Sequence, residues 1–364
     1  MPAPKPAAID AFTSLRGLAA WWVVLYHFHP GGLPGPLAAV VQQGYLAVDL
    51  FFVLSGFVIW LNYAPSLRDP SWTSTGRFLR ARLARIWPLH AVMSALYLSV
   101  PASVLLFSSV GDPGPRFAPG YYLASLFLVH NWGWFEEIGW NVPSWSISTE
   151  WAAYLLFPLA VPLLLRLRTV AARLAMIACL LIAIGLLFDA TRTASLGDDI
   201  AHLGLARCLL EFSIGAILCQ LYVDGRTGSR ALLLGAAAAL ALAYALRLAP
   251  DWAVMPAAFA CLILALTTGR NRLLGGRTLA RLGEISYSTY LAHYFLKDWT
   301  KFLLVRPGIP EWVVFAAYLG ATLIASALLY RWVEKPGQKW MRQLGQPPVA
   351  QSDIHALANA PAVQ

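Results

Sequence analysis

Arg16 and His27 lie in the stretch LRGLAAWWVVLYHFHP, residues 15–30, which is apolar enough to cross a bilayer. An ionisable side chain in hydrocarbon costs about 2.5–3.5 kcal/mol on insertion scales, so each one kept there calls for a partner or a function. The two residues are eleven positions apart, which on an α-helix is three turns plus about 20°, so both point to one face. The rise between them is about 16 Å, which predicts Arg16 near one membrane interface and His27 toward the other. The alternatives without a catalytic role are an Arg16 that snorkels to the interface and a His27 that lies at the interface. His29 does not share the helical face of Arg16 and His27.

Two carboxylates are expected at the depth of His27. Asp49 lies less than two turns into GYLAVDLFFVLSGFVIW, and Glu150 lies early in NVPSWSISTEWAAYLLFP. Ser146, Glu150 and Tyr154 recur every four residues and therefore share one helical face. These groups together with His27 predict an acid–base cluster in a polar cavity, and the alternative is a hydrogen-bond network that only holds the helices together.

A basic cluster is expected at the opposite depth. Arg82 and Arg85 lie at i, i+3 in FLRARLARIWPLH and so share a face. The residues that enter at the same level are Arg16, Arg281, Arg331 and Lys335. A fork of guanidiniums suits a polyphosphate, although the bias of positive charge toward cytoplasmic loops explains any single one of them.

The elements that must position these residues are transmembrane helices. Of the 364 residues, 59% are hydrophobic and 12% are charged, which is typical of an all-α polytopic membrane protein. Ten segments have the length and apolarity of a span, namely 12–30, 44–63, 86–108, 145–165, 173–189, 203–223, 231–248, 252–268, 284–304 and 312–333. The run 121–131 is too short to cross and is expected to be interfacial or re-entrant.

Charge distribution orients this topology. With the N-terminus inside, 20 of the 27 Lys and Arg fall in inner segments, so both termini are expected in the cytoplasm. The same bias explains the net charge of +9 without nucleic acid. Residues 12–340 are expected to form one membrane domain, between disordered segments at 1–11 and 341–364. The four cysteines lie singly in apolar runs, and no metal site is predicted.

Six motifs in order resemble acyltransferase family 3, the bacterial integral-membrane enzymes that commonly O-acylate surface and secreted glycans. Arg16 and His27 are similar to its R-x10-H pair, and GYLAVDLFFVLSGF resembles its G-x-x-G-V-D-L-F-F-V-L-S-G-F signature. RLARIWP, WSISTEWAAY and GEISYSTYLAH resemble R-x-x-R-I-x-P, W-S-x-S-x-E-x-x-x-Y and G-x-x-S-Y-x-x-Y-L-x-H, and Arg331 with the EKP of residues 334–336 resembles the closing motif. The departures are Ala47 for a glycine, Ala81 for an arginine of a frequent R-R pair, and His90 for a tyrosine.

The resemblance implies transfer of an acyl group, most often acetyl, from cytoplasmic acyl-CoA to a hydroxyl of an extracytoplasmic or lipid-linked glycan such as exopolysaccharide or O-antigen. This places the chain in a bacterial inner membrane, with acyl-CoA as donor substrate and no permanently bound cofactor. The expected acyl-CoA ligands are Arg16, Arg82, Arg85 and Arg331. His27 is expected to act as general base or transient acyl carrier, oriented by Glu150 or Asp49. The tunnel-lining residues are expected to be Ser146, Tyr154, Ser286, Tyr287 and His293.

A carrier or flippase is the alternative, with the buried charges forming a substrate path or proton relay. The ten spans show no internal inverted repeat, and the basic and acidic clusters are separated by depth. Both observations favour the transferase.

Overall fold

The computed structural model describes residues 7–107, 112, 114–269, 271 and 273–344, and all regular secondary structure in these residues is helical. The first half contains α1 (Ala7–His27), α2 (Gly35–Gln42), α3 (Ala47–Tyr63), α4 (Trp72–Tyr97), α5 (Ser99–Phe107), α6 (Pro119–Leu126) and α7 (Trp145–Leu164). The second half contains α8 (Val170–Thr191), α9 (Ile200–Val223), α10 (Arg230–Ala245), α11 (Asp251–Thr267), α12 (Arg277–Glu284), α13 (Ser286–Leu304), α14 (Glu311–Leu329) and α15 (Lys335–Gln343). Short 3-10 turns and one π-helical turn, Tyr330–Glu334, lie between some of them.

The all-helical class is confirmed, and each of the ten predicted segments falls on a helix. The largest difference is α4, which begins at Trp72, fourteen residues before the predicted span. Ser71 caps this helix by a reciprocal capping box with Ser74. Residues 72–85 include four arginines, which lower the hydropathy of this part of the helix, so hydropathy alone did not mark it as part of the span. Residues 1–6 and 345–364, the outer parts of the two expected disordered segments, lie outside the described residues.

Within the described residues, six helical segments are long and apolar enough to cross a membrane: Gly35–Leu67, Trp72–Phe107, Val142–Leu164, Val170–Thr191, Ile200–Val223 and Glu311–Gln343. Large apolar side chains are exposed on the outside of the bundle, for example Leu106, Leu186 and Ile324. Such a surface needs lipid around it, and the chain is therefore a membrane protein. Ten crossings and cytoplasmic termini stay predictions.

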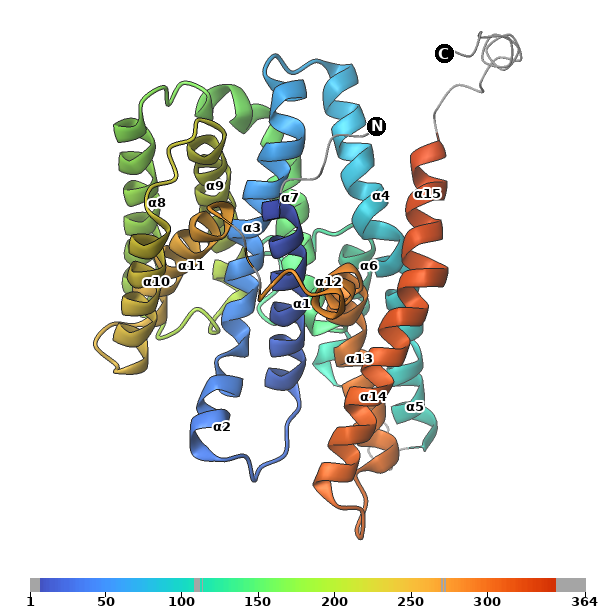
Figure 1. The fold of residues 1–364 in the computed structure, drawn as a ribbon. Helices are drawn as coiled ribbons and strands as arrows, with labels where there is room; N and C mark the ends of the chain where they lie inside the picture. Colours follow the sequence, from blue (N-terminus) through green and yellow to red (C-terminus); the bar gives the residue numbers. More distant parts are fainter. Residues whose placement is uncertain (1–6, 108–111, 113, 270, 272, 345–364) are drawn as a thin grey trace, which may run out of the picture.

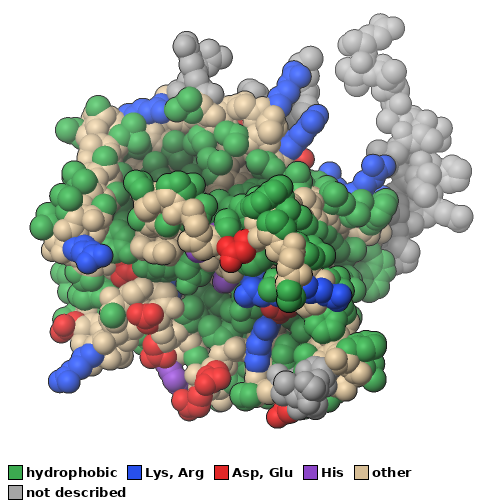
Figure 2. All heavy atoms as spheres, turned by 90° about the horizontal axis from the view of Figure 1, so that it is seen from below, with side chains coloured by type: hydrophobic (Ala, Val, Ile, Leu, Met, Phe, Trp, Pro, Cys, Tyr) green, Lys and Arg blue, Asp and Glu red, His purple; other side chains and the backbone are tan. Residues whose placement is uncertain are grey.

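The helices form one bundle with α1, α3 and α7 near its middle (Figure 1). In that view α8, α10 and α11 lie on one side, and α4, α5, α14 and α15 lie on the other. In the same view, the N-terminal end of α1 and the C-terminal end of α15 both point upward. On the opposite, lower face, charged side chains of both signs and histidines emerge among hydrophobic ones (Figure 2).

α3 and α9 pack backbone against backbone through two glycines. A Cβ added at Gly56 would overlap with the carbonyl oxygen of Phe212, and one added at Gly215 would overlap with the carbonyl oxygen of Val53. Small residues let transmembrane helices approach this closely. The contact fixes α3, which supplies one wall of a cavity inside the bundle.

Replacing Gly56 by Ala should therefore lower the free energy of unfolding by about 1–3 kcal/mol, the usual cost of overpacking. The measurement is the thermal unfolding midpoint of the purified protein in detergent. Gly235→Ala on α10 is the control, because a Cβ there meets no atom within 4 Å and alanine is the better helix former. Equal midpoints for the two variants would contradict the close packing of α3 on α9.

Candidate functional site

A cavity of about 240 Å³ lies inside the bundle between α1, α3, α4, α7 and α13. Its polar lining comes from five helices that are far apart in sequence: Arg16, Ser55, Arg82, Arg85, Ser146, Glu150, Tyr154, Ser286, Tyr287 and Tyr290. The remaining lining is apolar, as in most small-molecule sites. The structure thus brings together eight of the residues predicted from sequence.

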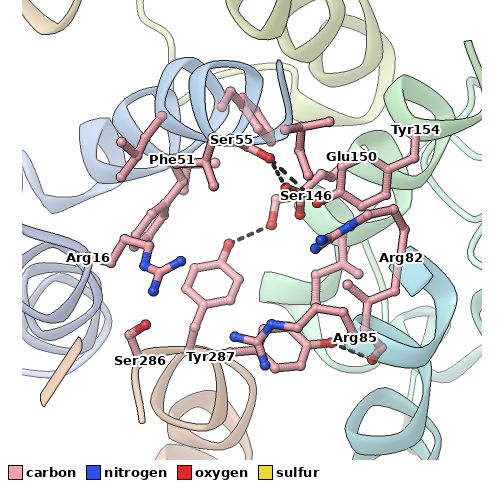
Figure 3. A pocket seen from close by; sticks show the side chains of 18 residues that line it. Arg16, Phe51, Ser55, Arg82, Arg85, Ser146, Glu150, Tyr154, Ser286 and Tyr287 are labelled. Carbon is pink, nitrogen blue, oxygen red and sulfur yellow. Dashed lines mark hydrogen bonds between the residues drawn. The ribbon is translucent and has the colours of Figure 1, made fainter. Parts of the chain in front are cut away.

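Three guanidiniums face this cavity from α1 and α4 (Figure 3). Arg85 forms an ion pair with Glu334. Arg82 lies over the rings of Tyr154 and Tyr63, at 5.0 and 5.8 Å from their centroids. Within the described residues neither Arg16 nor Arg82 has a carboxylate in ion-pair range, and the Nε atom of each is buried without a hydrogen-bond partner. In the part of the chain that the structure describes, the cavity therefore holds two cations without an ion-pair partner, and Glu150 is the carboxylate that shares the cavity lining with them.

Glu150 ties α7 to α3 along the cavity wall. It accepts hydrogen bonds from Ser55 and from Tyr154, whose Oη lies 2.5 Å from Glu150 Oε1. Ser55 belongs to the motif in the second predicted span but carried no predicted role. The carboxylate is held in place by both hydroxyls and points toward the cavity (Figure 3).

Tyr290 is the cavity-lining residue that contacts His293. Its hydroxyl lies 2.9 Å from the hydroxyl of Ser146 on α7. Its ring centroid is 5.9 Å from that of Phe51 and 5.9 Å from that of His293. One tyrosine ring thus borders the cavity and also contacts His293.

His27 and His293 are in direct contact. His27 Nδ1 lies 3.1 Å from His293 Nε2 and 3.1 Å from the carbonyl oxygen of Val23. The ring of Tyr294 packs edge-on against His27 at 5.0 Å. His293 is fully buried, and although it was expected to line the tunnel it is not among the residues that line the cavity.

Asp49 pairs with Arg207 of α9 and is not among the residues that line the cavity. Arg207 Nε is 2.6 Å from Asp49 Oδ1, and both side chains are buried. The guanidinium also packs over the ring of Trp145 at 5.2 Å and donates to the carbonyl of Leu196. The imidazole of His27 is contacted by His293, so the expected orientation of this ring by Asp49 or Glu150 is not what the structure shows. Arg207 was missed because a single arginine at the start of a span carries no motif.

Arg331 also differs from its expected place. Its side chain is exposed in the π-helical turn and does not line the cavity. Glu334, from the same closing motif, is buried and accepts hydrogen bonds from Arg85 and, at 2.6 Å, from Ser288. The C-terminal motif therefore reaches the site through Glu334, and acyl-CoA binding by Arg331 stays a prediction.

Comparison with known proteins settles the family. A family model described as an acyltransferase domain matches residues 9–331. The chain belongs to this family. The acyltransferase is 30% identical to Acyltransferase MdmB of Streptomyces mycarofaciens, covering 98% of both chains. No solved structure matches it.

Two further relatives are matched over a smaller share of their own length. The acyltransferase is 29% identical to a protein of Komagataeibacter xylinus named "Putative membrane-bound transacylase BcsY", over 89% of this chain and 81% of that one. It is 25% identical to "Putative O-acetyltransferase SACOL0978" of Staphylococcus aureus, over 92% of this chain, and the match spans 58% of that protein. Family membership and these names favour acyl transfer over the alternative function of a carrier or flippase.

The placement of Asp49 leads to a stability prediction. Arg207→Met should lower the free energy of unfolding by about 3–5 kcal/mol, because it leaves the buried carboxylate of Asp49 without its guanidinium. The thermal midpoint in detergent measures this effect. Arg306→Met, at an exposed position, should leave the midpoint unchanged. A normal midpoint for Arg207→Met would show that the pair does not stabilise the fold.

Proposed function

We propose that this acyltransferase moves an acyl group, acetyl in the first place, from acyl-CoA to a hydroxyl of an extracytoplasmic or lipid-linked glycan. The observation that carries the proposal is the pair of cations, Arg16 and Arg82, that face the cavity without a carboxylate partner among the described residues. A cation held in an apolar bundle is costly unless an anion joins it. The phosphates of CoA are such anions, and guanidiniums bind phosphate in a bidentate manner.

The dimensions of the cavity support a donor that enters only in part. Its volume of about 240 Å³ is below the range of about 300–1,000 Å³ that holds a whole drug-sized ligand. A narrow acyl-pantetheine arm fits this description better than a whole nucleotide does. The phosphates would then stay with the arginines while the thioester points toward Tyr290 and His27.

His27 is the proposed general base or transient acyl carrier. As a base it takes the proton of the acceptor hydroxyl while the oxygen attacks the thioester carbonyl. The C–S bond then breaks, the ester remains on the acceptor, and the CoA thiolate leaves with the proton. A glycan acceptor is supported by the family resemblance, and a hydroxyl as the acceptor group is supported by a relative named as a putative O-acetyltransferase. The charge bias of the sequence supports a bacterial inner membrane with the donor side facing the cytoplasm.

Labelled acetyl-CoA added to inside-out membrane vesicles tests the function. Covalent label should appear in glycan, or on the protein as an intermediate, and sealed right-side-out vesicles should incorporate none. Unmodified solute crossing the vesicle membrane, with no covalent label, would overturn the transferase in favour of a carrier.

His27→Ala should abolish acetyl incorporation while the amount of protein in the membrane stays that of the wild type. The reason is that the imidazole supplies the proton transfer. Immunoblotting and incorporation of label in the same vesicles measure both quantities. His29→Ala is the control, because within the described chain the His29 ring is hydrogen-bonded only to the carbonyl of its neighbour Pro30. Retained transfer by well-expressed His27→Ala would exclude the catalytic role.

Arg82→Met should raise the KM for acetyl-CoA by about 10-fold or more with a smaller effect on kcat. Loss of a hydrogen bond to a charged group is worth about 1.5–3 kcal/mol, and a group that binds ground and transition states equally affects KM. Initial rates at varied acetyl-CoA give both constants. Arg77→Met is the matched control, since Arg77 is on the same helix but is exposed and outside the cavity. Equal KM values for both variants would mean that Arg82 does not bind acetyl-CoA and only contributes to the orientation of its helix in the membrane.

A further inference from the structure

The contact between His27 and His293 has only one consistent arrangement of protons when both rings are neutral. His293 Nδ1 lies 2.7 Å from the carbonyl oxygen of Tyr290 and 3.2 Å from that of Thr289. A carbonyl oxygen only accepts hydrogen bonds, so His293 Nδ1 must be the donor. A neutral imidazole has a single N–H, and His293 Nε2 is therefore an acceptor.

The same reasoning fixes the proton of His27. The atom facing the acceptor His293 Nε2 is His27 Nδ1, at 3.1 Å. His27 Nδ1 also faces the carbonyl of Val23 at 3.1 Å. Two acceptors on two different helices thus require the proton to be on Nδ1. The lone pair of His27 is then on Nε2.

We infer that His293 is a positioning residue that holds His27 in its Nδ1–H form, so that Nε2 of His27 is the nitrogen that takes the proton of the acceptor. His293 does not line the donor cavity and is fully buried, and it acts through His27 alone. Partners of this kind fix the tautomer and the orientation of a functional imidazole in many enzymes. The catalytic part of the inference rests on the proposed function, whereas the tautomer does not.

The chemistry balances without a further group. The acceptor hydroxyl gives its proton to His27 Nε2 and its oxygen forms the new C–O bond. The imidazolium keeps its Nδ1–H directed at the lone pair of His293 Nε2, and the proton on Nε2 passes to the departing thiolate. His293 keeps its own N–H on the backbone carbonyls, so Nε2 is the atom that accepts the hydrogen bond from His27 in this step.

The fold links this pair to the donor cavity through Tyr290. The side chain of Tyr290 lines the cavity, and its backbone carbonyl accepts the hydrogen bond from His293. Both features sit on one turn of α13, opposite α1. The ring of His293 is therefore fixed by the same turn that lines the cavity.

Nitrogen NMR on protein labelled with ¹⁵N-histidine tests the tautomer without any activity. The chain has seven histidines, and the signal of His27 is the one lost in His27→Gln. We expect a protonated Nδ1 and an unprotonated Nε2 for His27 in the wild type. In His293→Leu we expect the signal to move toward the Nε2–H form that free imidazole prefers. An Nε2–H form of His27 in the wild type would overturn the inference.

Transfer rates test the positioning role. His293→Gln places a carbonyl oxygen near the position of Nε2 and keeps an acceptor, whereas His293→Leu removes it at similar volume. We expect Leu to lower kcat by about 10–100-fold, the range seen for outer partners of functional histidines, with KM for acetyl-CoA unchanged. Gln should recover most of this loss.

The outcomes separate the two proposals. Equal kcat for His293→Gln and His293→Leu, with equal thermal midpoints, would overturn the positioning role. An Nδ1–H signal for His27 in a protein that transfers no acyl group would support the arrangement of protons in the His27–His293 contact and overturn the proposed acyl transfer. Active enzyme with His27 in the Nε2–H form would overturn the positioning role of His293 and leave the proposed acyl transfer standing.

Discussion

Charges inside an apolar bundle must be neutralised by other helices, because hydrocarbon offers no water to do so. Arg207 of α9 meets Asp49 of α3, and Arg85 of α4 meets Glu334 beyond α14. Each pair joins helices that are distant in sequence, so the charges specify which helices meet. Arg16 and Arg82 are the exceptions among the cavity cations of the described chain, and this exception separates the site from the scaffold.

The scaffold pairs also explain how remote segments reach the site. Glu334 lies in a π-helical turn, a form that often occurs at functional sites. From there its carboxylate receives Arg85 and Ser288. The Arg85 guanidinium is thereby held over the ring of Tyr287, at 5.1 Å from the centroid. A residue near the end of the described chain thus sets the position of a cavity arginine on α4.

Sequence patterns predicted the helices and most of the cavity because both depend on local rules. The four-residue spacing of Ser146, Glu150 and Tyr154 put them on one face, and all three line the cavity. What the patterns could not give was the choice of partner across helices. Asp49 lies in the first turn of α3, close to the start of the predicted span, yet its direction toward Arg207 depends on how closely α3 packs on α9. The place of a residue along its helix follows from counting residues in the sequence, whereas the partner that its side chain faces follows from how the helices pack.

The ring of Tyr290 has a consequence for the membrane itself. A polar path that ran unbroken from the arginines to the histidines would conduct protons and dissipate the gradient across the bilayer. Between the cavity and His293 stands the ring of Tyr290, which contacts both Phe51 and His293. An aromatic ring at that place puts apolar surface between the charged recess and the imidazoles, which shortens any continuous row of polar groups in a membrane that has to hold a proton gradient.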